Sequence, residues 1–136
     1  MVAFPSQEWI ETFREKINAN DAYASAAKDW EGDFLFVVEP EGDLNEPATF
    51  YVDLWHGKCR EARILEPGEE VKAAFTYAGP YRNWVRLIEG QIDPIRGLLT
   101  GKFHLKGSMM KVMRYTKAAK ILVQTASEVP TEFPGT

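Results

Sequence analysis

The sequence contains few of the residues that usually carry covalent or metal chemistry. Its 136 residues include one cysteine, Cys59, and two histidines, His56 and His104. One cysteine can form neither an intramolecular disulfide bond nor a thiolate zinc site, and no metal-ligand spacing joins the two histidines. The sequence also lacks a nucleophile elbow, a phosphate-binding glycine loop and a dinucleotide-binding fingerprint. We therefore expect no catalytic residues, no metal and no cofactor.

Targeting and membrane-spanning segments are also missing from the sequence. No apolar run approaches the ~18 residues that a membrane-spanning helix needs. The first residues, "MVAFPSQEWIETF", lack the charged and apolar regions of a signal peptide, and the last, "TEFPGT", are not a peroxisomal address. Together with the single cysteine, these features favour a cytoplasmic protein. The net charge of -4 and the absence of a recognition motif disfavour nucleic acid as a partner.

Charge is distributed unevenly along the chain. No acidic residue lies between Pro94 and Ser127, whereas the rest of the chain holds all 20 acidic residues and nine of the 16 basic ones. The basic quarter is either a solvated helix face that pairs with the acidic body or a surface for anionic lipid headgroups or phosphate. For the second interpretation we expect the contacts to come from Lys111, Arg114, Lys117 and Lys120.

The length and composition predict one domain with a substantial core. A chain of 136 residues has the usual size of a single domain, and its 45% of hydrophobic residues suffices for a buried interior. We treat residues 1–136 as that domain. Its end, "SEVPTEFPGT", has the composition of a frayed tail, so we expect residues 126–136 to be loosely held.

The first half of the sequence predicts two helices followed by four strands. Ser6 and Asp21 can cap the helices, and Gly32 can end the second of them. The segment "DFLFVVEP" is a compact apolar strand candidate, and "TFYVDLWHGKCREARIL" predicts a hairpin with one apolar face. The segment "VKAAFTYAG" alternates in hydrophobicity as a half-buried strand does. We expect the four consecutive strands to pair through short turns.

The second half predicts two helices, a fifth strand and a last helix. Pro80 and Asp93 open the two helices, "KFHLK" is the strand, and Ser108 caps a helix with methionines along one side. The order of these elements predicts an α+β fold with a five-stranded, mostly antiparallel sheet covered by helices.

The stretch "NWVRLIEGQIDPIRGLLTGKFHLKGSMMKVMRY" resembles the sterol carrier protein family, type two. In that family a helix ends in a glycine, here Gly90, and a second short helix follows, here residues 93–99. A strand between two glycines, here residues 101–107, then leads into a capped helix that begins at Ser108. The resemblance extends over about residues 8–123. It implies a sheet and helices around an apolar tunnel, and non-catalytic binding or transfer of a fatty acid, acyl-CoA, phospholipid or sterol.

The resemblance and the apolar residues after position 74 together suggest a ligand site. We expect Phe103 and Leu105 to form a tunnel floor, with Met109, Val112 and Met113 as a movable wall, because methionine adapts to irregular shapes. The full set of expected ligand contacts is Phe75, Tyr77, Trp84, Ile88, Ile95, Leu98, Leu99, Phe103, Leu105, Met109, Val112 and Met113.

Other functions remain open at this stage. The apolar groove could receive a partner subunit, which makes the chain an accessory or dimerisation module and a possible homodimer. The basic quarter could make peripheral contact with an anionic membrane. An enzyme acting on an apolar substrate, with His104 or Tyr77 as acid or base, is a further alternative.

Overall fold

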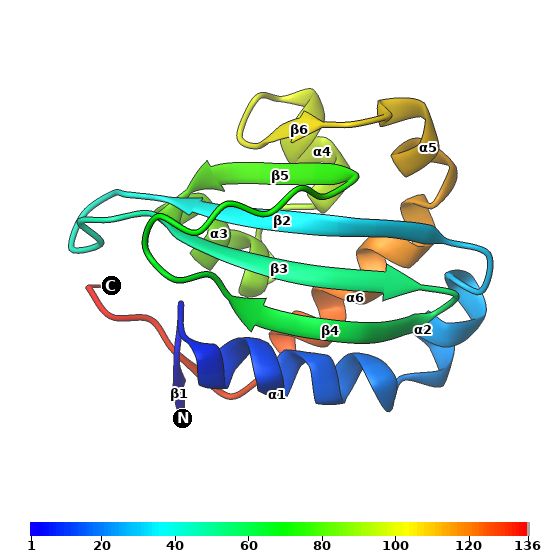
Figure 1. The fold of residues 1–136 in the computed structure, drawn as a ribbon, viewed down its shortest axis with the longest axis horizontal. Coiled ribbons are helices and arrows are strands. Elements are labelled where there is room, and N and C mark those ends of the chain that lie inside the picture. The colour runs from blue at the N-terminus through cyan, green and yellow to red at the C-terminus, as the bar shows by residue number, and fades with distance from the viewer. Residues whose placement is uncertain (136) are drawn as a thin grey trace.

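The computed structural model describes residues 1–135 and contains a five-stranded sheet with helices behind one of its faces (Figure 1). The strand order is β4-β3-β2-β5-β6, in which β2 pairs with β5 in parallel and all other neighbours are antiparallel. This arrangement confirms the predicted α+β fold and the mostly antiparallel sheet. The strands are β2 Glu31–Glu39, β3 Ala48–Trp55, β4 Lys58–Ile64, β5 Phe75–Pro80 and β6 His104–Lys106.

The pairing of β5 differs from the expected succession of short turns. β5 lies beside β2 instead of β4, and residues 65–74 cross the face of the sheet opposite the helices to reach it (Figure 1). The register places Phe75 opposite Phe34 and Tyr77 opposite Phe36, so both strands present aromatic side chains to the same face. Alternation along a strand specifies which side chains share a face, but not which strand lies alongside. The expectation failed for that reason.

Residues 1–135 also form six helices, and three of the helix caps expected from the sequence are present. Ser6, Asp93 and Ser108 accept hydrogen bonds from backbone N–H groups at the starts of α1, α4 and α5, as predicted. Asn20 caps α2 in place of the expected Asp21, and Gly32 lies within β2 instead of ending that helix. The helices are α1 Gln7–Asn18, α2 Asp21–Ala26, α3 Tyr81–Ile88, α4 Pro94–Leu99, α5 Met109–Arg114 and α6 Thr116–Ser127.

The single last helix expected after Ser108 is two helices, because the backbone leaves helical geometry at Tyr115. The break lets α5 and α6 take different directions, with α5 beside β6 at the edge of the sheet and α6 behind it (Figure 1). Among residues 1–135, no helix has the length and apolar character needed to cross a membrane.

The end of the chain packs against the start instead of fraying. Strand β1 Val2–Ala3 pairs in parallel with β7 Thr131–Glu132. The indole N–H of Trp9 donates to Thr131 Oγ1 at 2.9 Å, and the Tyr81 hydroxyl donates to the Pro134 carbonyl at 2.6 Å. These partners lie more than 50 residues apart in sequence, so local composition carried no signal of them.

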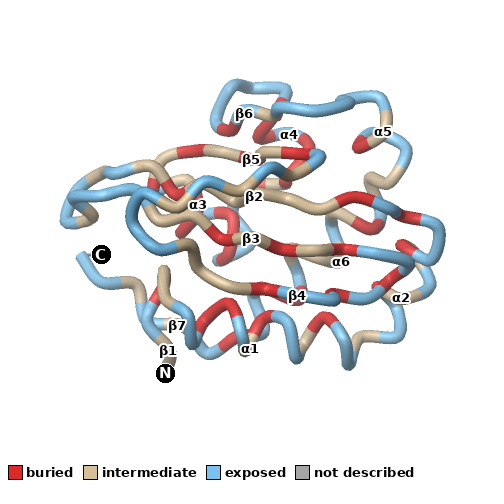
Figure 2. Tube along the Cα trace, viewed as in Figure 1, coloured by how far each residue is buried: buried red, intermediate tan, exposed pale blue. Residues whose placement is uncertain are grey.

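The core lies between the sheet and the helices. Phe50, Val52 and Leu54 of β3 alternate inward, and Figure 2 shows buried positions alternating with less buried ones along that strand. The edge formed by β6 and α5 is largely exposed in the same view. One face of the sheet therefore supplies the interior, as the predicted alternation requires.

Gly107 makes the join between β6 and α5 possible. Its φ of +120° is a conformation that residues with side chains rarely adopt, and an added Cβ would lie 2.5 Å from Phe75 Cδ1 and 2.8 Å from the Ala74 carbonyl oxygen. Gly68 also has a positive φ, +80°, but an added Cβ there would meet nothing within 4 Å. A comparison of substitutions at the two glycines therefore separates the energetic cost of backbone strain from that of steric clash.

We predict that Gly107→Ala lowers the free energy of unfolding by about 3 kcal/mol, since strain and clash add. Gly68→Ala, the matched control, is expected to lower it by about 1 kcal/mol from strain alone. Urea denaturation followed by circular dichroism measures both values. Equal losses in the two variants would show that the close packing of Gly107 on Phe75 and Ala74 is unimportant.

Candidate functional site

A hollow, which we call the main hollow, lies between the inner face of the sheet and the helices. Its volume is about 90 Å³, and one water molecule requires roughly 10–15 Å³ of such space. The main hollow therefore has room for more than a few water molecules. The lining comprises Phe4, Trp9, Phe13, Phe34, Phe36, Phe50, Tyr77, Trp84, Leu87, Ile88, Pro94, Ile95, Val112, Ala119, Leu122, Val123 and Ala126.

The lining offers almost no free polar atom. The Tyr77 hydroxyl donates to the Pro94 carbonyl at 2.8 Å, and the Trp84 indole N–H donates to the Val37 carbonyl at 2.9 Å. The Trp9 indole N–H is bonded to Thr131, as described above. Because the three polar side-chain groups of the lining are already paired with protein, a guest in this hollow is held by shape and apolar burial.

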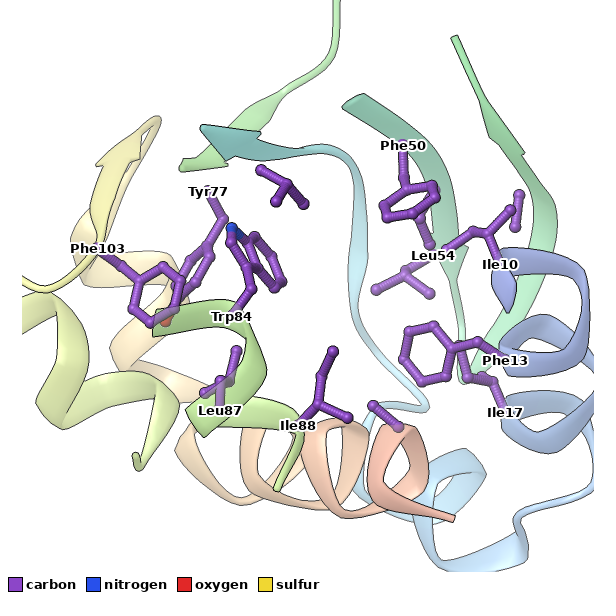
Figure 3. Close-up of a cluster of buried hydrophobic side chains, with 14 of the residues drawn as sticks. Ile10, Phe13, Ile17, Phe50, Leu54, Tyr77, Trp84, Leu87, Ile88 and Phe103 are labelled. Carbon is purple, nitrogen blue, oxygen red and sulfur yellow. The ribbon is translucent and has the colours of Figure 1, made fainter. Parts of the chain in front are cut away.

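One wall of the hollow is built from interlocking aromatic rings. The Phe103 ring centroid lies 4.7 Å from that of Tyr77 and 5.3 Å from that of Trp84. Figure 3 shows these three rings together, across from Phe13 and Phe50. Phe103 itself is 1% exposed and lies behind the lining, where a Cβ on Gly79 or Gly97 would clash with its ring. The two glycines accommodate the ring that supports the wall.

A second, smaller hollow adjoins the first. Its volume is about 50 Å³, and it is bounded in part by Tyr23, Trp30 and Leu54. The two hollows share four lining side chains, which come from β2, α5 and α6. We call these residues the partition: Phe34, Val112, Ala119 and Leu122. The apolar tunnel expected from the resemblance stays a prediction, because the structure has two hollows with this partition between them.

The structure brings together some of the predicted ligand contacts and separates others. The following line the main hollow: Tyr77, Trp84, Ile88, Ile95 and Val112. Three others are buried but do not line it: Phe75, Leu98 and Phe103. Leu105 is half-buried on β6, and neither hollow includes it. Exposed to solvent are Leu99, Met109 and Met113.

The expected methionine wall is thus absent from the hollow. Met109 and Met113 are 37% and 41% exposed, and only Val112 of α5 reaches the lining. The side that α5 turns towards the core carries Val112, whereas its methionines lie towards solvent. Phe103 is buried as a floor residue should be, but it supports the lining from behind.

The prediction missed the contribution of the first half of the chain. Trp9, Phe13, Phe34, Phe36 and Phe50 all line the hollow. Their signal was present, since Trp9 and Phe13 share a helix face and the three phenylalanines occupy the apolar face of their strands. Without the relative placement of the elements, nothing distinguished these rings from ordinary core.

Of the four basic side chains predicted to contact an anionic headgroup or phosphate, two are already engaged with other groups of the protein. The Lys111 ammonium group donates to the Glu31 carbonyl and lies 4.9 Å from the Trp30 ring centroid. Lys120 faces Asp93 across 3.8 Å. Arg114 and Lys117 are exposed, and within residues 1–135 no ion pair engages them.

The titratable groups near the core are poorly suited to reaction. Burial, assisted by the negative charge of Asp93, raises the pKa of the Tyr77 hydroxyl well above its usual range. His104 is exposed on β6, and His56 contacts Glu31 Oε2 at 2.6 Å on the surface. Within the part of the chain that the structure describes, no cluster of three or more histidine, cysteine or acidic side chains could hold a metal ion.

Comparisons with known proteins agree on one family. A family model described as the SCP-2 sterol transfer family matches residues 10–120. A crystal structure of sterol carrier protein 2 is 31% identical, with a TM-score of 0.81 over 90% of this chain and 96% of that chain. A conserved hypothetical protein from Thermus thermophilus, described as possibly a sterol carrier protein, is 32% identical, with a TM-score of 0.84 over 93% of this chain and 90% of that chain.

A more distant structure shares the fold alone. Palmitated SCP2L2, a protein of Aedes aegypti, is 16% identical, with a TM-score of 0.53 over 81% of this chain and 93% of that chain. None of the curated protein sequences compared with the chain matched it.

Cys59 provides a test of how tightly the core beside α1 is packed. Burial raises the pKa of its thiol to about 12, whereas an unfolded cysteine has a pKa of about 8.5. Since the thiolate is the reactive form, we predict that iodoacetamide does not label the folded protein at mildly alkaline pH but labels it rapidly in denaturant.

The same pKa shift makes stability depend on pH in a defined direction. The unfolded thiol loses its proton first as pH rises through about 8.5, so the Cys59 contribution to the free energy of unfolding falls from there towards pH 12. Denaturation curves at increasing pH, compared with those of Cys59→Ala, isolate this contribution. Rapid labelling of the native protein would contradict a closed core at this position.

Proposed function

The chain belongs to the SCP-2 sterol transfer family, and from this membership we propose that it binds one long apolar lipid in the main hollow and carries it without chemical change. Members of this family bind apolar lipids. The single observation that carries the proposal is the lining itself, which consists of aliphatic and aromatic side chains whose three polar groups are already hydrogen-bonded to protein. Such a surface selects a guest by hydrophobic burial and shape.

The empty space has an energetic cost that a guest would remove. Protein interiors normally leave few voids larger than a water molecule. A hollow of about 90 Å³ costs roughly 2 kcal/mol, on the scale of about 24 cal/mol per Å³ measured for cavities in protein cores. An alkyl chain inside it would recover this cost through the dispersion contacts it makes with the lining.

The hollow must enlarge to admit a whole alkyl chain. An engineered apolar cavity of about 150 Å³ admits benzene, whereas the two hollows here measure about 90 and 50 Å³. Movement of the partition would join them. Three of its members belong to α5 and α6, on either side of the break at Tyr115, and Ala119 offers little side chain to obstruct a guest.

Burial of an alkyl chain supplies enough free energy for useful affinity. Each methylene contributes about 0.8 kcal/mol, so ten methylenes contribute about 8 kcal/mol before the entropy of association is subtracted. Micromolar affinity is within this range without any charged contact. Among the lipid classes expected, we favour fatty acids and acyl chains over sterols, because a narrow hollow suits a flexible chain better than a rigid ring system.

The two candidate acid–base groups support a carrier over an enzyme. The Tyr77 hydroxyl is engaged with Pro94, and its raised pKa disfavours ionisation at neutral pH. His104 lines neither hollow. A guest in the main hollow therefore meets no side chain placed to exchange a proton with it.

We predict that Ala119→Phe weakens binding of a fluorescent fatty acid about tenfold or more, because the new ring occupies space that about two methylenes would otherwise fill. Gln124→Phe is the matched control, since it adds the same ring to an exposed site of α6. Fluorescence titration of delipidated protein measures both affinities, and thermal melts establish that both variants fold. Undiminished binding by Ala119→Phe would place the lipid elsewhere. Absence of binding by the unaltered protein would refute the carrier function.

We predict that Leu122→Ala shifts the preferred chain length of saturated fatty acids upward, because it removes part of the partition. In the unaltered protein, affinity should rise about fourfold per methylene until the hollow is full, and in the variant this rise should continue to longer chains. Leu35→Ala is the control, because Leu35 is half-buried and lines neither hollow. A displacement assay across the chain-length series gives both optima. The same optimum in all three proteins would show that the partition does not limit the site.

A further inference from the structure

The edge of the molecule along β6 and α5 exposes an unusual combination of side chains. Three of the four methionines of the chain lie on α5, and Met109, Met110 and Met113 are 37%, 71% and 41% exposed. Met113 lies three residues after Met110 and four after Met109, so it neighbours both of them on the helix surface. An exposed apolar patch of this kind needs an explanation beyond the scatter of single apolar residues found on most surfaces.

Unpaired cations precede and follow these methionines in the sequence. Lys106 precedes α5 on β6, Arg114 ends α5, and Lys117 lies in the first turn of α6. All three are exposed, and none takes part in an ion pair with any of residues 1–135. No acidic residue occurs anywhere between Pro94 and Ser127. This edge therefore combines exposed methionines with unpaired cations and carries no acidic side chain.

Protection of an edge strand accounts for only part of this pattern. β6 is the last strand of the sheet, and lysines on such strands discourage pairing with another chain. That role explains Lys106 but not three solvent-exposed methionines on the adjoining helix. Thioether chains flanked by cations instead match a bilayer surface, where apolar groups enter among the headgroups and cations meet lipid phosphates.

We propose that this edge docks onto an anionic lipid bilayer, with Met110 entering the headgroup region and Lys106, Arg114 and Lys117 facing the lipid phosphates. The position of α5 connects the membrane contact with the apolar site. Val112, on the same six-residue helix, lines both hollows and belongs to the partition. Docking therefore places the bilayer one helix away from the apolar site, where displacement of α5 would open a route between them.

Vesicle flotation tests the electrostatic part of the proposal. The protein is expected to float with vesicles of phosphatidylcholine and phosphatidylserine, to release as salt is raised, and to bind phosphatidylcholine vesicles weakly. The double variant Arg114→Glu/Lys117→Glu should bind the anionic vesicles at least 25-fold more weakly, at about fivefold for each cation lost. Vesicle binding that does not depend on phosphatidylserine content or on salt concentration would overturn the proposal.

A second double variant controls for net charge. Lys28→Glu/Lys58→Glu changes the charge equally, but Lys58 lies on β4, at the opposite edge of the sheet, and Lys28 follows α2. Neither lysine takes part in an ion pair within the described chain, residues 1–135. This variant should retain most of the binding. If it loses as much as Arg114→Glu/Lys117→Glu, the attraction is general and the docking edge is wrong.

Met110→Ser tests the apolar part. It should weaken vesicle binding at every salt concentration, while binding of a fluorescent fatty acid stays unchanged because Met110 lines neither hollow. Unchanged fatty-acid binding also shows that the variant folds. Vesicle binding that is unaffected by Met110→Ser would contradict the insertion of Met110 into the headgroup region. Light scattering without vesicles supplies a further check: a dimer that this substitution dissociates would assign the edge to a second copy of the chain and refute membrane docking.

Discussion

The structure depends on one packing constraint: a sheet whose apolar face consists largely of aromatic rings must be covered, yet rigid rings cannot fill the layer completely. Phe34 stacks with Phe36 and Phe75 at ring-centroid distances of 5.2 and 5.1 Å, and Phe36 contacts Trp84 at 5.8 Å. Aromatic side chains have few torsions with which to adapt. Of the four side chains that α6 contributes to the lining, two are alanines, Ala119 and Ala126, which fill little of the remaining space. The main hollow is the result.

The short helix α5 connects this interior to the surface. Ser108 caps it, and Lys111 anchors it to the start of β2 through the Glu31 carbonyl and the Trp30 ring. With the helix held in this way, Val112 faces the hollows while Met110 faces solvent. One six-residue element therefore belongs both to the proposed lipid site and to the proposed membrane-docking edge. A change in its position affects both.

Much of the local structure could be predicted from the sequence, because its determinants are local. The caps at Ser6, Asp93 and Ser108 depend on side chains within three residues of the N–H groups they satisfy. Alternating hydrophobicity indicated β3 and β5 with their inner faces, and a compact apolar run indicated β2. The stretch from residue 84 to the start of the last helices carried enough pattern to indicate the family, which the family match over residues 10–120 confirmed.

The sequence by itself determined where most helices and strands lie and which of their faces are apolar, since both properties follow from periodicity along the chain. It did not indicate the break at Tyr115 or the short strands β1 and β7. Only the tertiary structure decided that β5 pairs with β2 and that aromatic residues from the first half line the hollow. It also decided that the methionines of α5 lie outside and that the chain end packs on Trp9. Each of these depends on contacts between distant residues, and periodicity carries no information about which distant surface will lie opposite a given face.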